Sequence, residues 1–186
     1  MHGKVIYMKD EHIKQFVLNY LGTHVTKNDL VMDATVGNGY DTITLANLAS
    51  RVIGFDIQKE AIDTTKSKLS DLDIHNVELV LDSFETIASY TGYKGVVFNL
   101  GYLPNGNKTL TTIATITLKT IQIIVDQMHI DDFILITAYP GHPEGFKESK
   151  LLLDYIKTLN PNYISLIYQI QNRLNAPFVI VIERKK

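Results

Sequence analysis

The chain has 186 residues, of which 45% are hydrophobic and 20% charged, values ordinary for one soluble domain with a substantial core. The absence of cysteine excludes disulfides, thiolate metal sites and a cysteine nucleophile. A formal net charge of −2 excludes general polyanion binding. A nucleic-acid substrate would need a local basic face, for which the scattered candidates are Lys108, Lys119, Lys147, Arg173, Arg184, Lys185 and Lys186.

The sequence also predicts the compartment, the number of domains and whether a metal is bound. No apolar run approaches the roughly 20 residues that span a bilayer, and the first residues lack the apolar core and cleavage site of a signal peptide. We therefore expect a cytoplasmic protein without a membrane partner. Residues 1–186 contain no repeat or linker, which predicts a single domain. The six histidines lack the i, i+4 spacing of helical ligands, so we expect no metal site.

The first half of the chain alternates apolar runs with amphipathic stretches. Apolar residues at helical spacing predict an N-terminal helix over residues 10–22. Beyond it, the same patterns predict strands at 29–35, 51–57 and 77–81, and helices at 39–49, 58–71 and 83–90.

In the second half, the patterns predict strands at 96–100, 133–138, 162–170 and 177–183, and helices at 112–128 and 146–158. Unbroken apolar strands that alternate with helices imply a parallel sheet covered on both faces. The last two strands are separated by too few residues for a parallel crossover, so they should form an antiparallel hairpin. The predicted fold is α/β: a seven-stranded, mostly parallel, Rossmann-like sheet with a C-terminal antiparallel hairpin, the layout of class I methyltransferases.

The segment after the first strand reads Asp33-Ala34-Thr35-Val36-Gly37-Asn38-Gly39. Its glycines let the backbone pass close to a ligand and adopt φ values that a Cβ would forbid. The helix that follows begins with unpaired N–H groups. The next strand ends at Asp56, and an acid there can accept both hydroxyls of a ribose. We interpret these features together as a cofactor site.

S-adenosylmethionine fits this site better than a dinucleotide. The dinucleotide-binding motif has a third glycine at the position where this chain has Thr42. The chain also lacks the Gly-Lys-Ser/Thr sequence of a P-loop. Asp33 suits the cationic amino-acid part of the cofactor and Asp56 suits its ribose. Asp82, which ends the third strand, can accept from the adenine amino group with Ser83 beside it. The alternative is that all three acids only form turns or cap helices.

Polar residues also follow the fourth and fifth strands. Asn99, Gly101 and Tyr102 lie where the ligand crevice of an open α/β sheet should be, and the Asn99 amide oxygen can accept from an amine. Alternatively, Asn99 is a buried polar residue satisfied by neighbouring loops. Tyr139 can stack on a base, and His142 can act as a base or hold a phosphate, but His142 can equally cap the next helix.

The sequence resembles a bacterial family once labelled as rRNA methylases and now associated with YtqB/MnmM-type tRNA methyltransferases. The likeness rests on Asp33 to Thr42, which matches the signature Asp-Ala-Thr-x-Gly-Asn-Gly-x-Asp-Thr, and on three further segments. These are Gly54-Phe55-Asp56-Ile57-Gln58, Phe98-Asn99-Leu100-Gly101-Tyr102-Leu103-Pro104 and Asn172-x-x-Asn175-Ala176-Pro177-Phe178.

The resemblance implies transfer of a methyl group from S-adenosylmethionine to the amine of 5-aminomethyl-2-thiouridine at the tRNA wobble position, with the anticodon stem-loop as partner. From the strand ends and the resemblance together, we expect the cofactor to be bound by Asp33, Thr35, Gly37, Asn38, Gly39, Asp41, Thr42, Asp56, Ile57, Gln58, Asp82, Ser83, Asn99 and Gly101. The open alternatives are an rRNA or small-amine methyltransferase, a NAD enzyme and a non-catalytic nucleotide-binding module. A homodimer through the apolar face of helix 112–128 is a further hypothesis.

Overall fold

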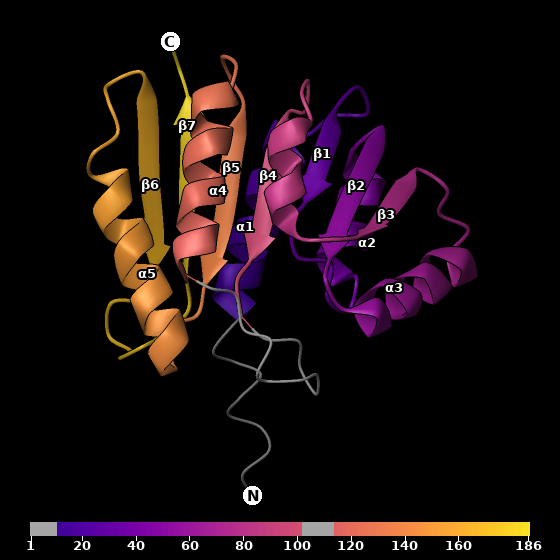
Figure 1. The fold of residues 1–186 in the computed structure, drawn as a ribbon, viewed down its shortest axis with the longest axis horizontal. Helices are drawn as coiled ribbons and strands as arrows, with labels where there is room; N and C mark the ends of the chain where they lie inside the picture. The colour runs from indigo at the N-terminus through magenta and orange to yellow at the C-terminus, as the bar shows by residue number, and fades with distance from the viewer. Residues whose placement is uncertain (1–10, 102–113) are drawn as a thin grey trace, which may run out of the picture.

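The computed structural model describes residues 11–101 and 114–186. Within them, one seven-stranded sheet has the order β3-β2-β1-β4-β5-β7-β6 (Figure 1). The strands are β1 (Leu30–Asp33), β2 (Arg51–Asp56), β3 (Val77–Leu81), β4 (Gly95–Asn99), β5 (Phe133–Ala138), β6 (Tyr163–Gln169) and β7 (Phe178–Arg184). The pairs from β3 to β5 are parallel, and β7 pairs antiparallel with both β5 and β6. The predicted architecture, including the terminal hairpin, is confirmed.

Helices cover both faces of the sheet because alternate strand residues are apolar on each face. The helices are α1 (Glu11–His24), α2 (Tyr40–Leu48), α3 (Lys59–Asp71), the 3₁₀ helix η1 (Phe84–Ser89), α4 (Ala114–Gln127) and α5 (Pro143–Ile156). Met32, Phe55 and Phe98 pack in one core cluster with residues of η1, α4 and α5. Val31 and Val97 pack in the other cluster with residues of α1 and α2.

The strand predicted at 29–35 ends two residues earlier, at Asp33, and three predicted helices differ in type or by two or more residues in their limits. The helix predicted at 10–22 extends to His24, and the one predicted at 83–90 is the 3₁₀ helix η1. The helix predicted at 146–158 begins at Pro143, three residues earlier, because proline presets the helical φ at the first position and His142 caps the N-terminus. None of the helices in the described part of the chain has the length and apolar character needed to cross a membrane.

Most of the apolar face of α4, the surface predicted for a dimer contact, is buried within the molecule. Ile121, Ile124 and Val125 belong to the core cluster that also contains residues of η1 and α5. The exposed positions of α4 are polar: Thr115, Lys119, Gln122 and Asp126. Helix α4 therefore contributes most of its apolar side chains to the core of one protomer.

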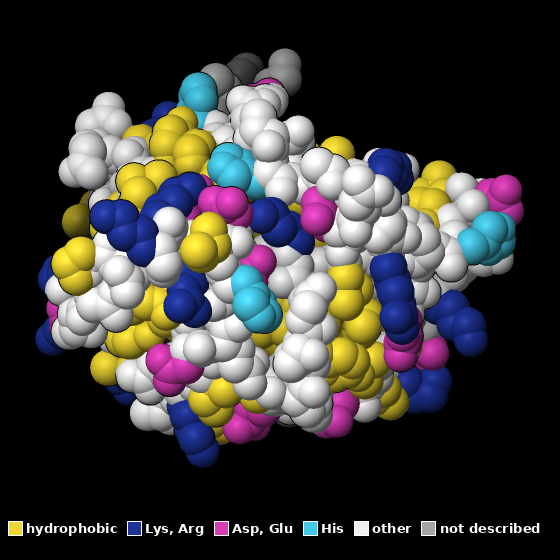
Figure 2. Space-filling view, turned by 90° about the horizontal axis from the view of Figure 1, so that it is seen from above, with side chains coloured by type: hydrophobic (Ala, Val, Ile, Leu, Met, Phe, Trp, Pro, Cys, Tyr) yellow, Lys and Arg dark blue, Asp and Glu magenta, His cyan; other side chains and the backbone are white. Residues whose placement is uncertain are grey.

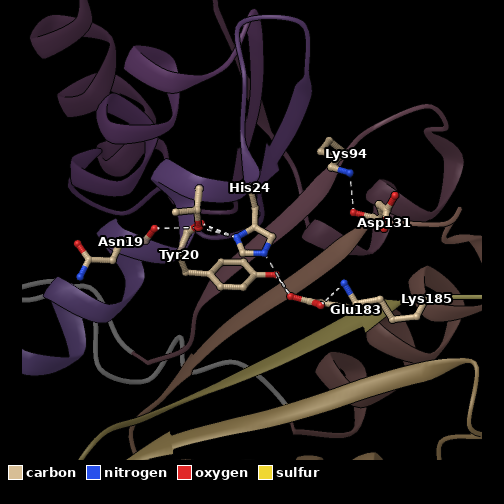
Figure 3. Close-up of polar contacts among 8 residues, drawn as sticks. Asn19, Tyr20, His24, Lys94, Asp131, Glu183 and Lys185 are labelled. Atoms are coloured by element: carbon tan, nitrogen blue, oxygen red, sulfur yellow. Dashed lines mark hydrogen bonds and ion pairs between the residues drawn. The ribbon is translucent and has the colours of Figure 1, made fainter.

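A polar cluster attaches α1 to β7 at the edge where the parallel strands begin (Figure 3). The Tyr20 hydroxyl donates to Glu183 Oε1 at 2.8 Å, and Lys185 Nζ lies 2.6 Å from Glu183 Oε2. Burial raises the pKa of Glu183, but hydrogen bonds from Lys185 and Tyr20 more than offset it, so the pKa lies below its ordinary value. Figure 2 shows this edge with basic, acidic and histidine side chains interspersed rather than gathered by sign.

Candidate functional site

The candidate site lies at the opposite edge, where the parallel strands end. Strands β3, β2, β1 and β4 are consecutive neighbours, so the residues at their carboxyl ends stand side by side. Asp33 ends β1, Asp56 ends β2, Asp82 follows β3 and Asn99 ends β4. This arrangement is the one in which open α/β sheets hold ligands.

The loop between β1 and α2 needs glycine at two positions. Gly37 has a φ of 51° and Gly39 a φ of 78°, both in the left-handed region. A Cβ on Gly39 would lie 2.6 Å from Oγ1 of Thr65 in α3, so the loop and α3 approach too closely for any side chain. Gly39 also precedes α2 without a side-chain cap, which leaves the helix N-terminus lined by bare backbone.

The Asp33 carboxyl lies beneath this loop. It is 1% exposed and accepts hydrogen bonds from the Thr35 N–H at 3.1 Å and from the Thr42 hydroxyl at 2.6 Å. Burial and the charge of nearby Asp41 raise the pKa of Asp33 to about 7. Thr42, which replaces the third glycine of the dinucleotide fingerprint, is fully buried and holds Asp33 in place. Both side chains therefore shape the loop from below rather than line an open crevice.

Asp56 joins the two neighbouring loops. Its Oδ2 accepts the Gly37 N–H at 2.9 Å, and its Oδ1 accepts the Gln58 N–H, also at 2.9 Å. The carboxylate is partly exposed, and the adjacent Ile57 is 56% exposed. Each carboxylate oxygen has more than one lone pair, so Asp56 can hold the glycine loop and still accept from a ligand hydroxyl.

At the end of β3, the polar residues form a local turn. Asp82 is exposed, and its Oδ1 accepts the Ser83 N–H at 2.7 Å. The Ser83 hydroxyl in turn accepts the Glu85 N–H at 3.3 Å and caps η1. Asp82 and Ser83 thus form a turn and cap a helix, as the alternative interpretation of the strand-end acids predicts. The Asp82 carboxylate is nevertheless exposed at the same edge of the sheet as Asp33 and Asp56.

Asn99 connects β4 to the glycine loop and to α2. Its backbone N–H donates to the Thr35 hydroxyl oxygen at 2.7 Å, and its Nδ2 donates to Asp41 Oδ2 at 2.8 Å. Burial raises the pKa of Asp41, while the hydrogen bond from Asn99 and the charge of Lys14 oppose that shift. Because an ionised carboxylate only accepts, Asp41 turns the Asn99 amide so that its oxygen points the other way.

Residues after β4 and β5 also meet at this edge. A Cβ on Gly101 would lie 3.7 Å from Cδ2 of Tyr139, so these two segments are adjacent. The Nδ1 of His142 accepts the Gly145 N–H at 3.1 Å, so His142 is the N-cap of α5. Capping is the alternative that the sequence offered to a role as a base or a phosphate contact. Tyr102 and Lys108 lie outside the described residues.

Helix α3 supports the glycine loop through contacts that the sequence pattern did not indicate. Lys68 Nζ donates to the Asn38 carbonyl at 2.7 Å and lies 4.2 Å from the centre of the Tyr40 ring. The Thr65 hydroxyl donates to the Gly37 carbonyl at 3.3 Å. A lysine on an amphipathic helix is ordinarily a solvated surface charge. The residues around Lys68 in the sequence therefore gave no sign that it contacts the glycine loop. Among the described residues, no three His, Asp or Glu side chains gather as metal ligands.

Comparison with known proteins identifies relatives along most of the chain. Residues 52–183 match the sequence profile of a family described as "Putative rRNA methylase". The crystal structure of a "putative rRNA-methylase" from Clostridium thermocellum has a TM-score of 0.87 at 33% identity, covering 92% of this chain and 96% of that one. A "putative methyltransferase" from Streptococcus mutans in complex with SAH has a TM-score of 0.84 at 34% identity, covering 92% and 97%.

A plant relative extends the comparison to a named reaction. The chloroplastic tRNA (mnm(5)s(2)U34)-methyltransferase of Arabidopsis thaliana is 29% identical over 179 residues, or 87% of this chain, which spans 65% of the relative's length. The profile match covers more than half of the chain, and the two bacterial structures exceed 30% identity over nearly all of it. The chain therefore belongs to the family described as "Putative rRNA methylase" and has the fold of class I methyltransferases.

Proposed function

We propose that the protein is an S-adenosylmethionine-dependent methyltransferase that converts 5-aminomethyl-2-thiouridine into 5-methylaminomethyl-2-thiouridine at the tRNA wobble position. The observation that carries the proposal is the Asn99 amide, held by Asp41 beside the glycine loop with its oxygen free to face an amine. The plant relative is named for this modified uridine, and the Streptococcus mutans relative was crystallised with SAH. The partner in this proposal is the tRNA anticodon stem-loop.

The residues at the edge of the sheet fit S-adenosylmethionine. Gly37 and Gly39 turn the loop with left-handed φ values, and the N-terminus of α2 at Gly39 has no side-chain cap, which leaves its backbone N–H groups for a ligand. Asp56 has lone pairs for the ribose hydroxyls, and the exposed Ile57 offers an apolar surface for the adenine. Asp82 can accept from the adenine amino group. The buried Asp33 places an ionisable group beneath the cationic part of the cofactor.

In this proposal, the protein aligns groups and forms no covalent bond. S-adenosylmethionine, when bound, supplies an electrophilic methyl group. The substrate amine must be a free base, since an ammonium has no lone pair to attack with. Asn99 Oδ1 accepts an N–H of the amine, which aims the lone pair and stabilises the positive charge that develops on nitrogen. Tyr139 is proposed to stack on the uracil, and Tyr102 and His142 are proposed as further contacts to the substrate.

The buried Asp33 predicts that cofactor affinity depends on pH. Its pKa of about 7 means that the carboxyl ionises as the pH rises from about 6 to 8. An ionised Asp33 attracts a sulfonium, so we expect the Kd of S-adenosylmethionine to fall by about three- to tenfold over this range, a coupling of roughly 1 kcal/mol. Calorimetry at several pH values measures it.

Two comparisons test the cause of this dependence. S-adenosylhomocysteine has a neutral thioether and should show a smaller change with pH. Asp33→Asn keeps an acceptor for the Thr35 N–H and a donor for the Thr42 oxygen but cannot ionise, so its curve should be flat. An Asp33→Asn variant with the full pH dependence of the wild type would show that another group is responsible.

The proposed activity is tested with acceptors that differ in one feature. Labelled S-adenosylmethionine is incubated with tRNA that carries 5-aminomethyl-2-thiouridine, and with the same tRNA that carries plain uridine. We expect label only in the first, in a nucleoside heavier by one methylene group. Label in ribosomal RNA or a small amine instead would contradict the tRNA proposal, and cofactor binding without transfer to any acceptor would indicate a binding module.

A further inference from the structure

A groove of about 480 Å³ lies between α5 and the loop that joins β6 to β7. Helix α5 contributes Phe146 and Lys150 to its wall, Lys157 follows the end of the helix, and the loop contributes Arg173 and Leu174. In Figure 1, α5 and the β6–β7 hairpin stand at the end of the sheet farthest from β3.

The groove is basic although the chain as a whole is acidic. Lys150, Lys157 and Arg173 are all exposed, and the only acid among the described residues that line the groove is Asp154. Asp154 is paired with Lys157 at 3.1 Å, so two cations remain unbalanced in the lining. The formal net charge of the chain is −2, which makes this a local concentration of positive charge. A polyanion is the complementary ligand.

Apolar side chains stand among these cations. Phe146 is 56% exposed and Leu174 is 94% exposed, so neither contributes much to the core. An exposed aromatic ring between cations is the combination by which proteins bind single-stranded nucleic acid, with the ring stacking on an unpaired base and the cations contacting phosphates.

One end of the groove lies near the candidate site. Pro140 lines the groove, and its neighbour Tyr139 lies against Gly101, two residues beyond Asn99. On the other wall, the Asn175 carbonyl would lie 3.8 Å from a Cβ on Gly141, so the β6–β7 loop closes against the end of β5. A nucleic acid in the groove would therefore reach the edge where Asn99 is held.

We propose that this groove docks the anticodon stem-loop of the tRNA, with Lys150, Lys157 and Arg173 on the phosphates and Phe146 stacked on an unpaired base. The proposal rests on the proposed tRNA substrate and adds the surface that holds it. Asn99 and the glycine loop then act on the wobble nucleotide, while the groove holds neighbouring nucleotides of the loop.

The test is the double charge reversal Lys150→Glu with Arg173→Glu. Binding of a fluorescent anticodon stem-loop is followed by anisotropy at several salt concentrations, beside steady-state methylation of the tRNA. We expect the Kd for RNA and the KM for tRNA to rise at least about tenfold, and the salt dependence of log K to weaken by about 1.4, since each single-strand phosphate contact contributes about 0.7. The Kd for S-adenosylhomocysteine should stay unchanged.

Lys66→Glu is the matched control, because Lys66 is an exposed lysine on α3, which packs against β2 and β3 at the other end of the sheet. This control should bind RNA as the wild type does. Phe146→Ala tests stacking separately and should weaken RNA binding without changing the salt slope.

The outcomes separate the groove from the activity. If the wild type methylates tRNA and the double variant keeps its RNA affinity and KM, the groove is not the docking surface although the function stands. If the wild type methylates nothing, the function fails, and stem-loop binding still decides the groove. If the double variant alters sedimentation but not RNA binding, the groove covers a second copy of the chain, which overturns the proposal.

Discussion

Replacing Asn99 with alanine is expected to lower kcat by about 100-fold or more, while the Kd for S-adenosylhomocysteine changes less than about threefold. Removal of one preorganised polar group aimed at charge that develops in the transition state typically costs a factor of this size. The Asn99 backbone N–H to Thr35 survives the substitution, so the loop should keep its shape. Single-turnover methylation and calorimetry give the two quantities.

Asn47→Ala provides a matched control, because Asn47 is an exposed asparagine on α2 whose amide donates to the Ile43 carbonyl. It should leave kcat unchanged. Asn99→Asp adds a second test, since a carboxylate facing Asp41 loses the donor that orients the side chain. We expect Asn99→Asp to be as impaired as alanine. If loss of Asn99 instead weakened cofactor binding in proportion to turnover, its role would be to hold the cofactor rather than the amine.

Asp56→Ala should raise the Kd for S-adenosylmethionine by tenfold or more. Hydrogen bonds to charged groups are worth about 1.5–3 kcal/mol, and 1.4 kcal/mol corresponds to a tenfold change. The same substitution removes the acceptor for the Gly37 N–H, so the glycine loop also loses its connection to β2. At saturating cofactor, we expect kcat to stay within a few-fold of the wild type, because the proposed role of Asp56 is to hold the ribose and not the acceptor amine.

Two further variants test whether the loss of affinity comes from the Asp56 carboxylate itself. Asp56→Asn keeps the shape and one acceptor oxygen and should show an intermediate loss of affinity. Asp63→Ala removes an exposed carboxylate of α3 that pairs with Lys59 and should have no effect on the cofactor. An unchanged Kd for Asp56→Ala in calorimetry would count against the ribose assignment.

Asn99 and Asp56 divide the proposed chemistry between two neighbouring loops. The Asp56 carboxylate accepts the Gly37 N–H, and the Asn99 backbone N–H donates to the Thr35 hydroxyl, so both residues fix the same loop. In the proposed function they contact different ligands, the ribose and the amine. A cofactor that orders this loop would also fix Asn99. The two substitutions should therefore be separable in Kd and kcat. Only Asp56→Ala should increase hydrogen exchange in residues 34–39, because the Asn99 backbone N–H still holds Thr35 in Asn99→Ala.

The sequence by itself determined the sheet, its covering helices and the glycine loop. Unbroken apolar strands separated by amphipathic helices require a parallel sheet, and the short connection before Phe178 permits only an antiparallel return. The backbone at Gly37 and Gly39 is likewise a local property, since only glycine adopts these φ values freely. Such features depend on residues a few positions apart, so periodicity and residue type are enough to predict them.

Only the tertiary structure decided which polar groups meet. Asn99 reaches Thr35 and Asp41 across 64 and 58 residues, and Lys68 reaches Asn38 across 30, so no local pattern contains these pairs. The sequence likewise could not show that Asp33 is buried, or that Arg173 and Lys150 line one groove. The physical reason is that hydrogen bonds and charges act over a few ångströms in space, and folding alone brings distant residues within that range.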